Sequence, residues 1–334
     1  MSNCDIQCGD DACALFGSCK FVTVTNSSFS TRWSVFRFGG GVAENITVSN
    51  CIIDTVFGCP IKIAGGGRSR FQNMLFSNLV MNNVTGPISI SMGSRRYRRR
   101  PGMAGAGGTN NVAGTNSLAE NASANSIAET NNSYSPTNEV DEFTTTIMPV
   151  PPGEEPYIRN IVFANIRATV VKPFPLPEYA WTNGYNPGEV FSCIGLNALD
   201  GNFIENIVFE NVHVTFPGGG TAEQAAVRDV PKVVGEYYAA GVFPSYALYA
   251  RNVRGLTLND VRFELAAPDL RPAVVFDHVT DAAVNGLNVQ GIKDAESALR
   301  FIDSQDVLLS AARLIAPAPV FLQVEGADNG NIIV

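Results

Sequence analysis

The chain has 334 residues, 45% of them hydrophobic, and a formal net charge of −8 at pH 7. This composition supports a large core and excludes disorder throughout the chain, while the negative charge argues against nucleic acid as the main partner. No run of about 18 consecutive apolar residues is present, so no membrane partner is expected, and two histidines argue against a histidine-based metal site or a Ser-His-Asp triad.

The N-terminal segment is rich in cysteine. Four of the seven cysteines lie in the first 19 residues, namely Cys4, Cys8, Cys13 and Cys19. An odd number suits a complete disulfide framework poorly, and these spacings are not those of zinc sites. We therefore expect small buried thiols and no metal. The segment has neither a basic start nor an apolar stretch, so we predict no secretory signal in this chain.

A repeated pattern runs through most of the chain. Each copy has an apolar residue, two polar positions, a short β run, an Asn and a second β run. The clearest copies are ENITVSNCII (44–53), QNMLFSNLVM (72–81), RNIVFANIRA (159–168) and ENIVFENVHV (205–214), with weaker ones at 20–29, 254–263 and 283–292. The runs alternate and are rich in Val, Ile, Phe and Thr, which predicts strands and no helix.

The bend in each copy falls on a residue that suits a tight turn. These residues are Asn26, Asn50, Asn78, Asn165, Asn211, Asp260 and Gly286, with gaps of 24, 28, 87, 46, 49 and 26 residues. Asn tolerates the left-handed conformation, and amides stacked at one corner could share hydrogen bonds. A period of this length indicates a solenoid. We predict an all-β fold, a parallel β-helix (solenoid) with long loop insertions; leucine-rich repeats are the alternative, but their spacing is absent.

Three segments depart from the repeat. Residues 94–156 are rich in Gly, Asn, Ser, Ala and Thr, a composition that predicts a low-complexity, disordered loop off one coil. This divides the domain into N-terminal coils at 1–93, with the candidate active site, and C-terminal coils at 157–334. Residues 172–192 and 217–245 are further long loops, expected to wall a groove beside the stack.

The chemistry is expected near the N-terminus, where Gly9-Asp10-Asp11 lies between two β runs. Adjacent strand residues point to opposite faces, so two carboxylates reaching one groove need a bend, which Gly9 permits. One carboxylic acid could then protonate a leaving group while the other carboxylate activates water. The alternative is a turn whose aspartates cap backbone amides.

Longer stretches carry a family resemblance. They include NCDIQCGDDACALFG (3–17), FRFGGGVAENITVSNCIIDTVFGCPIKIAGGG (36–67), FPGGGTAEQAAVRDVP (216–231) and DLRPAVVFDHV (269–279). With them the chain, outside residues 94–156, resembles glycoside hydrolase family 28, the pectin-degrading polygalacturonases. The family has G-D-D, G-H-G and R-I-K motifs and a third aspartate one coil upstream. In this sequence the G-H-G position falls near residues 33–35, which lack His. The R-I-K position falls on residues 60–62, which keep the Lys, and the upstream aspartate would precede residue 1.

The resemblance implies roles for individual residues. Asp10 would be the general acid, and Asp11 would hold or activate water. Lys62 and Arg37 would bind the carboxylate of a uronate, although a solvated strand face is an alternative for both. Arg95, Arg96 and Tyr97 start a basic cluster that could attract a polyanionic chain, or form a charged loop start.

Other candidates have mainly structural interpretations. His213 and His278 lie beside apolar neighbours, and Asp54 precedes a turn, so all three are expected to be structural. The loop aromatics Tyr179, Trp181 and Tyr185 could stack on sugar rings or pack within their loop.

The resemblance therefore implies a right-handed parallel β-helix and an inverting glycoside hydrolase that acts on galacturonan or pectin, with an acidic plant polysaccharide as partner and no cofactor. A non-catalytic carbohydrate-binding β-helix is the alternative, and a Ca²⁺-dependent polysaccharide lyase a weaker one. The resemblance also implies that this chain lacks the first coils of a longer parent, and that the parent is extracellular or periplasmic.

Overall fold

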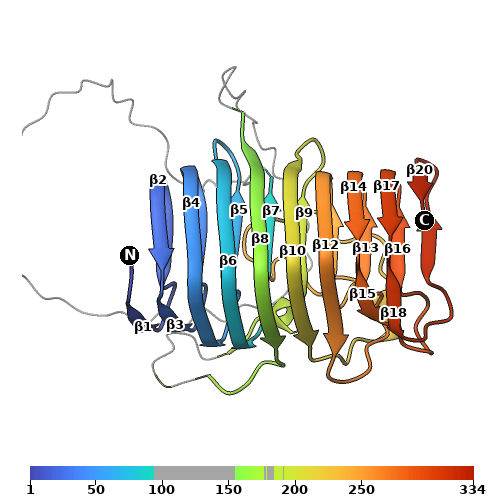
Figure 1. Cartoon of the computed structure of the whole chain (residues 1–334), viewed down its shortest axis with the longest axis horizontal. Coiled ribbons are helices and arrows are strands. Elements are labelled where there is room, and N and C mark those ends of the chain that lie inside the picture. Colours follow the sequence, from blue (N-terminus) through green and yellow to red (C-terminus); the bar gives the residue numbers. More distant parts are fainter. Residues whose placement is uncertain (94–154, 177, 179–183, 191) are drawn as a thin grey trace, which may run out of the picture. The chain divides into compact units, whose positions relative to one another are not determined.

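A computed structural model describes residues 1–93, 155–176, 178, 184–190 and 192–334. Its strands lie side by side in the order of the chain, with the N-terminus and the C-terminus at opposite ends of the row (Figure 1). The prediction of a disordered insertion falls on residues that lie largely outside the described part, and it stays a prediction. Within the described part, no helix has the length and hydrophobicity to span a membrane.

The parallel strand pairings form three runs along the row, which we call faces 1, 2 and 3. Face 1 begins with the first residues of two long strands, Cys13–Phe16 of β2 (Cys13–Thr25) and Phe36–Gly39 of β4 (Phe36–Val56). It continues with β5 (Ile61–Gly65), β7 (Ile88–Met92), β9 (Ile194–Ala198), β11 (Leu248–Arg251), β13 (Val274–Asp277), β16 (Leu299–Ile302) and β19 (Leu322–Glu325). Face 2 contains β2 (Cys13–Thr25), β4 (Phe36–Val56), β6 (Arg70–Val84), β8 (Tyr157–Val170), β10 (Ile204–Phe216), β12 (Val253–Leu265), β14 (Thr280–Asn285), β17 (Gln305–Ser310) and β20 (Gly330–Ile333). Face 3 contains β1 (Asp5–Cys8) and β3 (Ser28–Thr31), followed by the parts of the long strands β4, β6, β8, β10 and β12 that come after the corner residue. It ends with β15 (Asn288–Gln290) and β18 (Arg313–Ala316).

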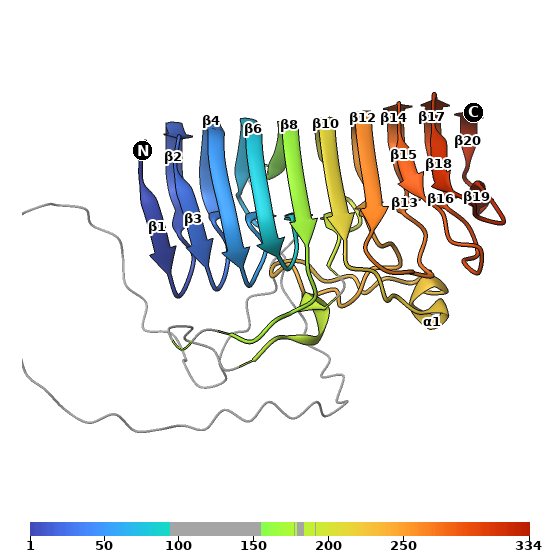
Figure 2. The ribbon, with the colours of Figure 1, turned by 60° about the horizontal axis from the view of Figure 1, so that its bottom comes forward.

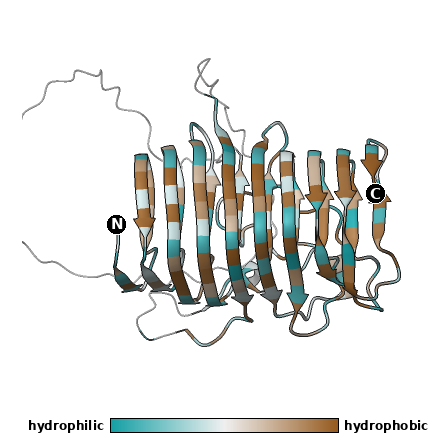
Figure 3. Cartoon of the chain, viewed as in Figure 1, coloured by the Kyte–Doolittle hydropathy of each residue, from teal (hydrophilic) through white to brown (hydrophobic). Residues whose placement is uncertain are grey.

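This all-β arrangement of stacked parallel strands is consistent with the predicted β-helix. Along the long strands, hydrophobic and hydrophilic residues largely alternate (Figure 3). The apolar set points inward, where aromatic rings stack from coil to coil: the rings of Phe76 and Phe163 are 5.3 Å apart, and those of Phe163 and Phe209 5.0 Å. Regular helix is confined, in the described residues, to α1 (Ala222–Ala225) and the 3-10 turn η1 (Pro187–Glu189).

The predicted corner residues all adopt the left-handed conformation. Their φ values are 51° at Asn26, 54° at Asn50, 54° at Asn78, 55° at Asn165, 51° at Asn211, 52° at Asp260 and 72° at Gly286. The predicted amide ladder is also present: Asn78 donates to Asn50 at 3.0 Å, Asn165 to Asn78 at 3.0 Å, and Asn211 to Asn165 at 2.8 Å. At Asn50, Asn78, Asn165, Asn211 and Asp260 one bent strand runs through the corner, where the sequence suggests two β runs. At Asn26 and Gly286 the two runs are separate strands, as the sequence suggests.

A second ladder, absent from the sequence prediction, lies five residues before the first. It joins Asn45, Asn73, Asn160 and Asn206 by amide hydrogen bonds of 3.1–3.2 Å. The cysteine prediction is correct only in part. All seven cysteines are free, and Cys13, Cys51, Cys59 and Cys193 are buried, but Cys4, Cys8 and Cys19 are only half-buried.

One long loop lies across face 1, and we call it the strap (residues 217–245). Near its start Arg228 forms an ion pair of 2.6 Å with Glu325, the last residue of β19. Farther along, the Val233 carbonyl accepts a hydrogen bond from Asn197 of β9, and the ring of Phe243 stacks on Tyr249 of β11 at 4.6 Å. The strap therefore covers part of face 1, whereas the sequence predicts a loop that walls a groove. Figure 2 shows α1, which belongs to the strap, below the row of strands.

Candidate functional site

Three polar residues of face 1 stand in one register column. Arg37 of β4 pairs with Lys62 of β5, and Lys62 pairs with Ser89 of β7. Their strand neighbours, among them Phe36 and Ile61, point into the core and are fully buried. The alternation noted in the sequence therefore directs Arg37 and Lys62 outward, on adjacent coils.

A chain of charged groups links these residues. The Arg37 guanidinium donates one hydrogen bond to Asp11 Oδ2 at 2.7 Å and another to Glu236 Oε1 at 2.8 Å. The Lys62 ammonium donates to the other oxygen of the same carboxylate, Glu236 Oε2. Asp11, Arg37 and Lys62, which the sequence analysis selected, therefore lie in one site, and the strap adds Glu236.

Burial differs strongly along this chain. The exposed fraction of the side chain is 2% for Lys62, 8% for Asp11, 24% for Arg37 and 35% for Glu236. Burial lowers the pKa of Lys62, and the charge of Glu236 opposes this shift. Burial also works against the charge on Arg37, but the hydrogen bond to Asp11 and the charge of Glu236 outweigh it and raise the pKa. Lys62 is therefore not on a solvated face: it is a buried cation held by one carboxylate.

The two aspartates have different surroundings. Asp11 accepts a hydrogen bond from the Ser34 amide at Oδ1, 3.0 Å away, while its other oxygen binds Arg37. Asp10 is exposed, and its Oδ1 accepts a hydrogen bond from the Asp11 amide at 2.8 Å. Each carboxylate thus caps a backbone amide, as the turn interpretation predicts, and Oδ2 of the exposed Asp10 has no partner among the described hydrogen bonds.

Several predicted residues lie elsewhere or outside the described part. Arg95, Arg96, Tyr97, Tyr179 and Trp181 are outside it. The hydroxyl of Tyr185 donates to the Phe174 carbonyl at 2.7 Å, and the Arg32 guanidinium lies over its ring, so Tyr185 packs within its loop.

The residues expected to be structural have local partners. Asp54 accepts a hydrogen bond from the hydroxyl of Thr55, which is the expected local cap. His278 lies 2.6 Å from Asp277, and His213 is on face 3, away from the charged chain of face 1.

Sequence reasoning missed Glu236, which is 174 residues away from its partner Lys62. It lies in the strap, where no repeat predicts its position. It also missed the contact of Tyr238, two residues farther along, with Trp33, whose ring centres are 6.0 Å apart and whose planes are tilted by 33°. The aromatic content of the loop was the only available signal for such packing.

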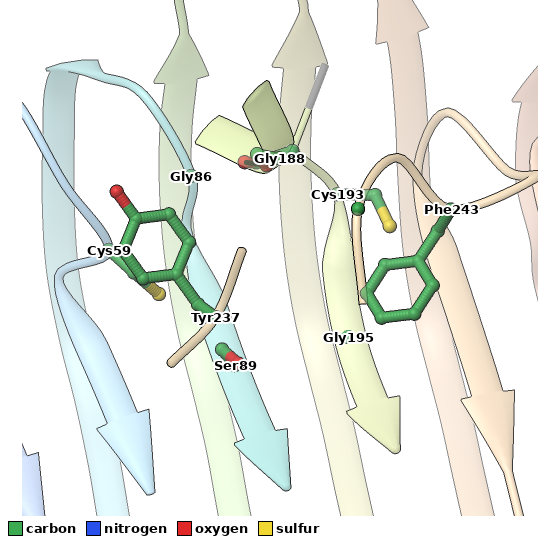
Figure 4. A pocket seen from close by; sticks show the side chains of 10 residues that line it. Cys59, Gly86, Ser89, Gly188, Cys193, Gly195, Tyr237 and Phe243 are labelled. Atoms are coloured by element: carbon green, nitrogen blue, oxygen red, sulfur yellow. Dashed lines mark hydrogen bonds between the residues drawn. The ribbon is translucent and has the colours of Figure 1, made fainter. Parts of the chain in front are cut away.

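A small cavity lies under the strap beside this site, lined by residues that include Cys59, Ser89, Tyr237 and Phe243 (Figure 4). Its volume of about 10 Å³ suits one water molecule and excludes a sugar ring. Burial raises the pKa of the Cys59 thiol to about 12, so this cysteine is no reactive nucleophile.

The described residues contain no cluster of three or more His, Cys, Asp or Glu side chains that could hold a metal ion. The arrangement on face 1 can instead bind a carboxylate between two cations and can offer an exposed acid beside it. No protein-family model matches the sequence, and no curated protein matches it at a significant level.

Proposed function

We propose that the chain is a glycoside hydrolase of the pectin-degrading type, and that it hydrolyses galacturonan or a related acidic plant polysaccharide with inversion. One observation carries the proposal: Asp11, Arg37 and Lys62 come from three successive coils, and their side chains join in one charged site next to Asp10. The proposal includes a right-handed winding of the coils, no cofactor, and an extracellular or periplasmic site of action.

The proposed reaction uses each group according to its surroundings. Asp10, the exposed member, donates its proton to the glycosidic oxygen as the bond to the anomeric carbon breaks. Water attacks that carbon from the opposite side and loses a proton to the Asp11 carboxylate. Asp11, fixed by Arg37 and the Ser34 amide, positions this water, and Arg37 and Lys62 bind the uronate carboxylate of the substrate.

A binding function without catalysis is the second candidate. Both oxygens of Asp11 already accept hydrogen bonds, one from Ser34 and one from Arg37. A carboxylate held in this way serves well as an anchor for Arg37 and poorly as a base that takes a proton from water. This favours a β-helix that binds an acidic polysaccharide and releases it unchanged.

The test is the release of reducing ends from polygalacturonate and from rhamnogalacturonan. The whole chain is compared with Asp10→Asn and with a matched control, Asp281→Asn, which changes an exposed aspartate on β14. Release by the wild type and the control, with loss of at least about a hundredfold in Asp10→Asn, is the expected result. Binding of trigalacturonate without release in any form would replace the hydrolase by the binding protein.

A further inference from the structure

The carboxylate of Glu236 has the position that a bound acidic ligand would take. One of its oxygens accepts from Arg37 at 2.8 Å and the other accepts from Lys62. Two cations, each donating to a different oxygen of one carboxylate, form a strong and geometrically specific site for that group. Glu236 comes from the strap, whereas both cations belong to face 1.

The strap holds the backbone of this segment while leaving the glutamate side chain partly open. Tyr237, the next residue, is buried beside the cavity, and Tyr238 packs on Trp33. Gly235, which precedes Glu236, has a φ of 129°, a conformation that favours glycine, and space for a Cβ is open there. The neighbouring anchors fix where the Glu236 side chain starts, but they do not cover its carboxylate.

We propose that Glu236 occupies the carboxylate-binding site of this protein in the absence of ligand, and that the carboxylate of an acidic sugar replaces it. The identity of the ligand as a uronate rests on the proposed function. Glu236 would thus set both the affinity and the selectivity of the site for acidic sugars.

The charges explain why such an exchange is favourable enough to occur. Lys62 is only 2% exposed, and a buried cation without a partner is costly, so an anion that faces Lys62 stabilises the site. Glu236 is 35% exposed, which lets its side chain turn into water at small cost. Exchange of one carboxylate for another leaves the balance of buried charge unchanged.

A neutral sugar cannot take part in this exchange. It has no charge to offer Lys62, so the Glu236 carboxylate would remain in place and continue to fill the site. The same reasoning makes Glu236 a competitor of every acidic ligand. Removal of its charge should therefore strengthen the binding of acids selectively, and leave the binding of neutral sugars as it was.

The experiment measures binding of trigalacturonate and of its fully methyl-esterified form by calorimetry. The proteins are the whole chain, Glu236→Gln, and Glu210→Gln as a matched control on an exposed site of β10. Because the competing charged hydrogen bonds are lost, Glu236→Gln should bind trigalacturonate at least about tenfold more tightly. The ester should bind equally to all three proteins, and the control should behave as the wild type.

Two results would overturn the inference. Equal or weaker binding of trigalacturonate by Glu236→Gln would mean that Glu236 supports the site and does not compete for it, and no binding by any form would remove the site itself. If Glu236→Gln does not fold, Glu236→Asp provides the same test. Its shorter side chain reaches Lys62 less well, so an intermediate gain in affinity is expected, and no gain would count against the inference.

The result separates this inference from the proposed hydrolysis. A selective gain in binding without release of reducing ends would reject the hydrolase and retain the role of Glu236. Release of reducing ends with an unchanged affinity in Glu236→Gln would do the reverse.

Discussion

Arg32 and Glu189 form an ion pair whose two side chains are fully buried, although 157 residues separate them in the chain. The guanidinium also donates to the Phe57 carbonyl at 2.8 Å and lies over the ring of Trp33. This pair fastens the loop that contains η1 to the first coils. The ring of Trp33 therefore lies between this ion pair and the strap, because Arg32 contacts it and Tyr238 of the strap packs against it.

Truncation of one partner should destabilise the fold strongly. Arg32→Ala leaves the Glu189 carboxylate buried without its cation, and we expect a loss of about 3–5 kcal/mol in the free energy of unfolding. Urea denaturation measures this loss. The double variant Arg32→Met/Glu189→Leu removes both charges and should recover most of the stability. A single variant within about 1 kcal/mol of the wild type would contradict the assignment.

Lys62 and Glu236 should respond unequally to substitution, because they differ in burial. Lys62→Met replaces a buried cation by an apolar side chain of similar length, and Glu236 can turn to water, so we expect stability within about 1 kcal/mol of the wild type. Glu236→Ala leaves Lys62 buried with a weaker set of partners and should cost about 1–3 kcal/mol. Thermal and urea unfolding of both variants test the inequality, and equal losses would refute it.

The repeat and the face of each strand could be predicted because both are local properties of the sequence. Asn78 and Asn165 announce their corners through their own conformational preference, and Ile61 and Ile63 show that Lys62 must point outward. The register of β4 and β5 then places Lys62 beside Arg37, which lies on the preceding coil. These features need no knowledge of distant contacts.

Residues in the long loops could not be placed in the same way. Glu189 and Glu236 reach their partners across 157 and 174 residues, through segments that carry no repeat and whose regular structure, in the described residues, is limited to the short elements η1 and α1. A loop of that kind can follow many paths, and the sequence pattern selects none of them. For the site, the most important such contact is the one between the strap and Lys62. It buries a lysine that the strand pattern alone allows to be solvated.

The Asn ladder should contribute through both conformation and hydrogen bonds. Asn78 has a φ of 54°, donates to Asn50 and accepts from Asn165. Asn78→Ala loses both contributions and should destabilise the protein by about 2 kcal/mol, whereas Asn78→Gly keeps the favourable conformation and should lose about 1 kcal/mol. Asn82→Ala, at an exposed position of the same strand, should change stability by less than about 0.5 kcal/mol. The order of the three variants in urea denaturation is the test.

The stability of the protein should fall on acidification partly because of His213. This residue lies on β10 between Arg167 of β8 and Arg262 of β12, with which it is in register. Burial lowers the pKa of His213 below its usual 6.5, and the charge of Arg167 adds to the shift. The unfolded chain therefore binds more protons than the folded chain as the pH falls through about 6.5, so folding loses free energy in that window and the loss levels off below the folded pKa. Urea unfolding at pH 7 and pH 5 measures the change. His213→Gln, which removes the titrating group, should show a smaller decrease between the two pH values than the wild type, and an equal decrease would show that other groups account for all of it.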